Sequence, residues 1–343
     1  MSAFILRRLL FLVFVLIGVS LLIFGIMMTF SPERRAAVFV NTPQQAEDIP
    51  NLIQLYGLND PIYIQYSRWL KSFLTGHMGW SHVASMPVSE AFFNYFPITL
   101  ELNLFAIPLT ILIGIWLGTI AGINQNRIID HAVRLVSIIG WSLPTFLFAL
   151  VLLLIFYGYF NIFPPGILSD QNNLMIINSP DEFVRYTGMY VIDGLINGNW
   201  TIVRDALYHL ILPIITQVVV VVALLMRIMR SGMIEELSKD YILTARAKGL
   251  PLNRVYLIHA RKNALIPVFT IAGQMTALSL EGSIAVEVIF NRQGMGWWLA
   301  ESATQLDMPV LMSMCMFMGF VFVLSNFIVD ILYAWIDPRI RYH

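Results

Sequence analysis

Cysteine is almost missing from this sequence. The one cysteine among 343 residues is Cys315, so neither a disulfide within the chain nor a cluster of thiolate metal ligands can form. Six histidines are present without the spacing that metal sites use, namely His77, His82, His131, His209, His259 and His343. The phosphate-binding pattern G-x-x-x-x-G-K-[ST] is absent too. We therefore expect this chain to bind no metal, cofactor or ATP.

Charged residues are also scarce. Only 12% of the residues are charged, whereas about a quarter are charged in a typical soluble domain. Lysine and arginine together number 21, as do aspartate and glutamate, so the net charge is zero and a broadly basic nucleic-acid-binding surface is excluded. With 58% hydrophobic residues, the composition predicts an all-α polytopic membrane protein.

Six segments are long and apolar enough to cross a hydrocarbon core about 30 Å thick. They are residues 8–30, 98–123, 134–160, 209–229, 264–290 and 308–335. In the first of them, Arg7 and Arg8 precede 21 uncharged residues. This run is longer than the roughly 7–15 apolar residues of a signal-peptide core, so we expect an uncleaved first span.

The distribution of basic residues predicts the orientation. If the N-terminus is cytoplasmic, the inner segments contain 14 of the 21 lysines and arginines: Arg7, Arg8, Arg127, Arg134, Arg227, Arg230, Lys239, Arg246, Lys248, Arg254, Arg261, Lys262, Arg339 and Arg341. The positive-inside rule therefore places both termini in the cytoplasm. We divide the chain into a first span (1–30), an outer region (31–97) and a core of five spans (98–343), with an outer insertion at 161–208 and a cytoplasmic loop at 230–263.

The cytoplasmic loop contains the stretch DYILTARAKGLPLNRVYLIHARKNALIP, residues 240–267. Helical spacing places Tyr241, Ala245 and Lys248 on one face. Gly249 and Pro251 predict a bend between two short helices. Because Ala245, Ala247 and Gly249 leave little side-chain bulk, a groove of another protein could approach closely. The alternative is a basic loop that only sets topology and rests on anionic headgroups.

This stretch resembles the cytoplasmic coupling loop of ATP-binding-cassette (ABC) importer permeases of the oligopeptide/dipeptide type. The resemblance rests on Tyr241, Thr244, Ala245, Arg246, Ala247, Lys248, Gly249 and Leu250, followed by Lys262, Asn263, Ala264, Leu265, Ile266 and Pro267. Further matches in family order are LTGHMGWS (74–81), PITLELNL (97–104), GWSLPTF (140–146), VEVIF (286–290) and NFIVDILYAWIDPRIR (326–341). The chain departs from the family pattern at Leu243, His77 and Gln293, where the family usually has glutamate, aspartate and proline.

The resemblance implies a type I ABC importer permease bundle in a prokaryotic cytoplasmic membrane. The eight residues from Tyr241 to Leu250 that match the family would couple this chain to two ATPase subunits, which bind ATP and Mg²⁺. A second, non-identical permease and an extracytoplasmic substrate-binding protein would complete the importer, and the chain itself would be no enzyme. Peptides are the favoured substrate, with oligosaccharides and nickel complexes as alternatives, and a secondary transporter without an ATPase is the competing class.

Three polar residues within the predicted spans are candidates for the translocation pathway. They are Gln217, Gln274 and Glu281. Gln274 and Glu281 are seven residues apart and would share a helix face. Because a carboxylate within a membrane is costly, Glu281 is expected either to contact substrate or to pair with a partner span.

Overall fold

The computed structural model describes the fold of residues 2–40, 48–179, 182–280 and 282–336. Within these ranges, five helices are long and apolar enough to cross a membrane, and one bent pair of helices brings the number of candidate spans to as many as six. The five long helices are α1 (Ser2–Met27), α6 (Val88–Ile123), α11 (Trp200–Leu237), α14 (Arg261–Leu280) and α17 (Met308–Ile336). The described chain is therefore mostly helical, with candidate membrane spans as the composition predicts.

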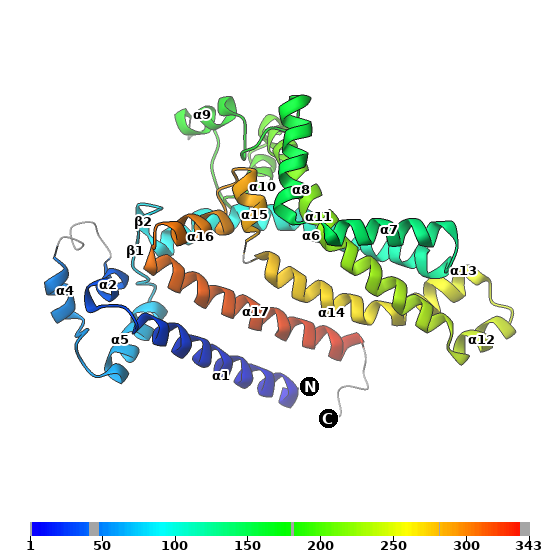
Figure 1. Cartoon of the computed structure of the whole chain (residues 1–343), viewed down its shortest axis with the longest axis horizontal. Helices are drawn as coiled ribbons and strands as arrows, with labels where there is room; N and C mark the ends of the chain where they lie inside the picture. The colour runs from blue at the N-terminus through cyan, green and yellow to red at the C-terminus, as the bar shows by residue number, and fades with distance from the viewer. Residues whose placement is uncertain (1, 41–47, 180–181, 281, 337–343) are drawn as a thin grey trace.

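The predicted third span, 134–160, is not one straight helix. It consists of α7 (Ile128–Ser142) and then α8 (Thr145–Leu152), which continues into the π-helical turn η2 (Leu153–Tyr159). The two parts are bent by 100°, and α8 points away from the other long helices in Figure 1. Pro144 explains the break, because proline disfavours helical backbone in the preceding residue, and Leu143 is extended with ψ of 122°.

The predicted fifth span, 264–290, also differs from the structure. Its helix begins earlier, because α13 (Leu252–Arg254) and the π-helical turn η3 (Val255–Ala260) run into α14. It ends at Leu280, and α15 (Ile284–Ile289) is a separate short helix. Gly282 allows the break, because its φ of +103° favours glycine and an added Cβ would lie 2.3 Å from the Gly296 nitrogen.

The described part of the first outer region, residues 31–97, is built mainly of short helices. It contains α2 (Pro32–Ala36), the 3₁₀ turn η1 (Ala37–Phe39), α4 (Ile49–Leu55) and α5 (Ile62–Leu74), followed by the short antiparallel strands β1 (Trp80–Ser81) and β2 (Met86–Pro87). Buried apolar side chains, among them Phe39, Leu58 and Trp69, join Phe24 of α1 and Met312 of α17 in one core. This region therefore packs directly on the first and last spans, and α6 begins ten residues before the predicted position 98.

The outer insertion is also ordered around short helices. It contains α9 (Asp170–Asn178) and α10 (Tyr190–Ile196), and α16 (Met295–Thr304) follows α15 later in the chain. Asp193 is 1% exposed and accepts hydrogen bonds from the backbone nitrogens of Thr187 and Gly188. The carboxylate thus holds the turn that leads into α10, and Val191 of α10 packs with Leu102 of α6.

Close contact between α6 and α11 forms the centre of the bundle. Three glycines of α6, spaced by four residues, face three large side chains of α11 with the same spacing. The glycines are Gly114, Gly118 and Gly122, and they lie against Leu225, Met229 and Met233 respectively. A Cβ added at these glycines would lie only 2.4–2.7 Å from the facing Cβ atoms. Small residues at this spacing allow membrane helices to approach closely.

The long helices run side by side between two ends of the molecule. In Figure 1, α4 and α5 lie at one end and α12 (Asp240–Ala247) lies at the other, while α17 extends between α1 and α14. Contacts between α17 and both α1 and α14 agree with this view. The candidate coupling segment is therefore far from the first outer region.

Candidate functional site

The segment 240–267 forms a helix, a tight turn and a second helix. α12 ends at Ala247, and Gly249 follows with φ of +72°, a backbone conformation that glycine adopts without steric cost. Pro251 then caps the start of α13 with φ of −62°. The predicted bend is present, but the second helix is not a short separate one, since it continues into the span that ends at Leu280.

Helix α12 buries one face and exposes the other. Ile242 and Ala245, three residues apart, are 0% and 8% exposed and pack against Val255 and Ala260. Ala245 is therefore an inward packing residue, which corrects the expectation that it offers a partner close approach. The other predicted coupling residues of this helix and turn are exposed, except for half-buried Leu250: Tyr241, Thr244, Arg246, Ala247, Lys248 and Gly249.

Tyr241 is only partly available to a partner, because its hydroxyl is turned toward α11 and α14. The hydroxyl donates to Glu236 Oε2 at 2.6 Å and accepts from Asn263 Nδ2 at 3.1 Å. Burial and the Glu236 carboxylate both raise the pKa of Tyr241 above its ordinary value. The phenol is thus a neutral hydrogen-bond donor near pH 7.

Arg246 lies over the ring of Tyr256, with its guanidinium carbon 5.9 Å from the ring centre. Such cation–π contacts contribute about 0.5–1 kcal/mol at exposed sites. The contact orients the basic side chain across the turn that Gly249 makes. The exposed part of the segment therefore presents an oriented Arg246 beside the exposed Thr244, Ala247 and Lys248.

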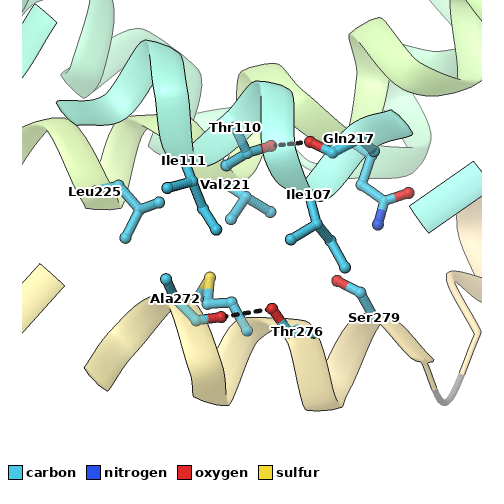
Figure 2. A pocket seen from close by; sticks show the side chains of 11 residues that line it. Ile107, Thr110, Ile111, Gln217, Val221, Leu225, Ala272, Thr276 and Ser279 are labelled. Carbon is cyan, nitrogen blue, oxygen red and sulfur yellow. Dashed lines mark hydrogen bonds between the residues drawn. The ribbon is translucent and has the colours of Figure 1, made fainter. Parts of the chain in front are cut away.

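The candidate pathway residue Gln217 lies in a narrow groove between α6, α11 and α14 (Figure 2). Its side chain is 7% exposed and donates from Nε2 to Asn103 Oδ1 at 2.7 Å. Asn103 Nδ2 in turn donates to the backbone oxygen of Ser279 at 2.8 Å. The groove has a cavity volume of about 20 Å³, which is enough for one water molecule and far too small for a peptide in this conformation.

The other two candidate pathway residues do not join Gln217. Gln274 is exposed, and it lies two residues from both Ala272 and Thr276, which line the groove. Two residues correspond to about 200° around a helix, so Gln274 faces away from the groove. Glu281 lies outside the described residues. Of the three candidates, Gln217 is therefore buried beside a polar partner, and Gln274 lies on the surface of the single chain.

Comparison with known proteins identifies the family. Residues 114–342 match the family of binding-protein-dependent transport system inner membrane components, and residues 1–103 match the N-terminal region of the same type of membrane component. The chain belongs to this permease family. The permease is a multi-pass membrane protein that is not itself catalytic. The relatives described next confirm its resemblance to the oligopeptide/dipeptide-type permeases.

Individual relatives cover nearly the whole permease. It is 40% identical to a probable D,D-dipeptide transport system permease of Escherichia coli over 85% of its own length and 84% of the relative. It is 36% identical, over the full length of both chains, to a dipeptide transport system permease of Alkalihalophilus pseudofirmus and to an oligopeptide transport system permease of Bacillus subtilis. These similarities extend through the outer regions as well as the spans.

Two buried carboxylates that pair with arginines across the permease bundle were not predicted from sequence. Arg292, which is not among the 14 basic residues of the predicted inner segments, is 0% exposed. Its Nη2 lies 3.3 Å from Glu101 Oε2, while Glu101 Oε1 accepts from the Val191 nitrogen at 2.6 Å. Asp130, also 0% exposed, accepts from Arg230 Nη2 at 2.8 Å. The first pair joins α6 to α10 and to the segment between α15 and α16, and the second joins α7 to α11. Neither pairing has a local sequence signal, because the partners are 191 and 100 residues apart.

Proposed function

We propose that this chain is one permease subunit of an ATP-driven, binding-protein-dependent importer of dipeptides or oligopeptides. We infer peptides as the substrate class from the full-length similarity to permeases of dipeptide and oligopeptide transport systems. The alternatives of oligosaccharides and nickel complexes have no comparable support. A transporter without an ATPase would not need an exposed, basic helix-turn-helix at the end of its long helices.

In this proposal the chain crosses the membrane six times, with α7 and α8 as one bent span and both termini in the cytoplasm. The positive-inside distribution of lysine and arginine supports this orientation. The regions 31–97 and 161–208 then lie outside, where a substrate-binding protein would deliver the peptide. A second, non-identical permease would complete the pathway, in which Gln217, Gln274 and Glu281 are candidate lining residues.

Energy would come from two ATPase subunits, which bind ATP and Mg²⁺ and contact the exposed face of α12. Closure of the ATPase pair would displace α12, and the helices attached to it would switch the pathway between outward and inward openings. Thr244, Arg246, Ala247, Lys248 and Gly249 are exposed on α12 and its turn. Since two long helices flank this segment, it is suitably placed to act as a lever.

The proposal is tested by copurification and uptake. The complex would be purified in mild detergent and reconstituted in vesicles, and uptake of labelled dipeptide, tripeptide, trisaccharide and nickel chelate would be compared with and without ATP. We expect ATP-dependent uptake of the peptides alone. Uptake of peptide without ATP, or a complex lacking ATPase subunits, would overturn the proposal.

A matched pair of variants tests the docking face. Ala247→Trp adds bulk to the exposed face of α12, and Ala303→Trp makes the same change at an exposed position of α16. We expect Ala247→Trp to lose the ATPase subunits during purification and Ala303→Trp to retain them. Equal recovery of ATPase from both variants would contradict docking on α12.

A further inference from the structure

Glu236 occupies an unfavourable position for a carboxylate. It lies in the last turn of α11, next to the final residue Leu237, and is only 9% exposed. A negative charge at a helix C-terminus opposes the helix dipole, and burial removes part of its hydration. A carboxylate can stay ionised there only if nearby donors offset both effects.

Three donors from different parts of the chain meet this carboxylate. Lys239, in the linker after α11, donates to Oε1 at 2.5 Å. Tyr241, in the first turn of α12, donates to Oε2 at 2.6 Å. Asn263, at the start of α14, lies 3.5 Å from Oε2 and donates to the Tyr241 hydroxyl at 3.1 Å. Glu236 thus connects α11, α12 and α14 through one side chain.

Apolar contacts lie directly beneath this polar network. Ile242 of α12 is fully buried and belongs to the same core as Met233 of α11 and Ala264 of α14. The helices α11 and α14 approach closely here, since a Cβ added at Gly232 would lie 3.2 Å from the Ala264 backbone oxygen. α12 packs on this apolar contact. The hydrogen bonds of Glu236 to Lys239, Tyr241 and Asn263 restrain rotation of α12 about it.

We propose that Glu236 is a positioning residue that fixes α12 to α11 and α14 at once, so that displacement of α12 moves both helices together. Tyr241 acts within this network, and not as a contact to the ATPase. This inference rests on the proposed importer function and adds to it the route by which motion of α12 reaches the bundle. Without the network, α12 would move with the ATPase, but α11 and α14 would not move with α12.

The test uses the complete importer in vesicles, with peptide, binding protein and ATP. The main variant is Tyr241→Phe, which removes only the hydroxyl oxygen, and the second is Glu236→Gln. Tyr256→Phe is the matched control, because it makes the same change in a tyrosine of η3 outside the network and keeps the ring beneath Arg246. The measured quantities are peptide taken up per ATP hydrolysed and the amount of ATPase retained in the complex.

We expect Tyr241→Phe and Glu236→Gln each to lower peptide uptake per ATP about tenfold, as the loss of one hydrogen bond to a charged group allows, with ATPase retained at the wild-type amount. Tyr256→Phe should match the wild type. The double variant should be little worse than either single variant, since both remove the same network. If Glu236→Gln fails to insert, Tyr241→Phe alone decides.

Two outcomes would overturn the inference. Wild-type uptake per ATP in Tyr241→Phe would show that the network does not transmit motion, and loss of ATPase from that variant would show that Tyr241 contacts the ATPase directly. Failure of the importer proposal is recognised separately, because the wild-type complex itself would then lack ATP-dependent peptide uptake.

Discussion

Replacing Gly118 by alanine tests how closely α6 and α11 approach. The new Cβ would lie 2.6 Å from Met229 Cβ and 2.8 Å from the Met226 backbone oxygen. Carbon atoms pack best at about 3.5–4.0 Å, so the two helices must separate by about 1 Å at this point. The matched control is Gly25→Ala in α1, where an added Cβ meets nothing within 4 Å.

The expected loss of stability follows from two opposing effects. Overpacking a tight contact costs about 1–3 kcal/mol, and a gap of 0.5–1 Å removes about a quarter to a half of each neighbouring van der Waals contact. Alanine gains about 0.5–1 kcal/mol over glycine in a helix. We therefore expect Gly118→Ala to lower the free energy of unfolding by about 1–2 kcal/mol, and Gly25→Ala to leave it unchanged or slightly raised.

The measurement is equilibrium unfolding of the purified permease in mixed micelles, with both variants treated identically. A difference of 1–2 kcal/mol corresponds to about a 5- to 30-fold change in the folded-to-unfolded ratio. If Gly118→Ala were as stable as Gly25→Ala, the close approach of α6 and α11 would be refuted.

Three further changes test other features. Arg292→Met leaves the Glu101 carboxylate buried without a counter-ion, so the free energy of unfolding from thermal melts should fall by about 3–5 kcal/mol. Adding Glu101→Leu should recover much of that loss. An undiminished melting temperature in the single variant would be inconsistent with the buried pair. Asp130→Asn removes the charge that Arg230 contacts, and the free energy of unfolding should fall by about 1.5–3 kcal/mol. A smaller fall than that of an exposed Asp→Asn change would argue against a stabilising pair of Asp130 and Arg230. Gly249→Ala places a side chain at φ of +72° and should destabilise the turn by about 1–2 kcal/mol, while Gly249→Asn should destabilise it less. Amide hydrogen exchange in α12 measures both effects. Equal exchange rates in the glycine and alanine forms would contradict the left-handed turn.

Sequence patterns predicted the long helices well, because each span needs a run of apolar residues that composition alone reveals. They did not predict where the spans bend. The serine-leucine-proline sequence at 142–144 carried a usable signal for the break before α8, since proline restricts Leu143. The end of α14 depends instead on the contact of Gly282 with Gly296, which is tertiary and has no local pattern.

Polar residues were predicted less well than apolar ones. The count of basic residues left Arg292 outside the inner segments but gave no sign that it is completely buried, because its partner Glu101 is distant in sequence. The inward turn of Tyr241 likewise depends on Glu236 and Asn263. The glycine spacing in α6 was visible in the sequence and would have predicted a close helix contact there, although only the structure identifies α11 as the partner.

Helix α11 has a consequence for communication across the membrane. Its 38 residues span about 57 Å at 1.5 Å per residue, almost twice the roughly 30 Å of a hydrocarbon core. One end contacts α10 of the outer insertion, and the other carries Glu236 and leads to α12. In the proposed orientation, docking of a loaded substrate-binding protein outside and use of ATP inside would therefore act on the two ends of one helix, which continues without a break past Pro213.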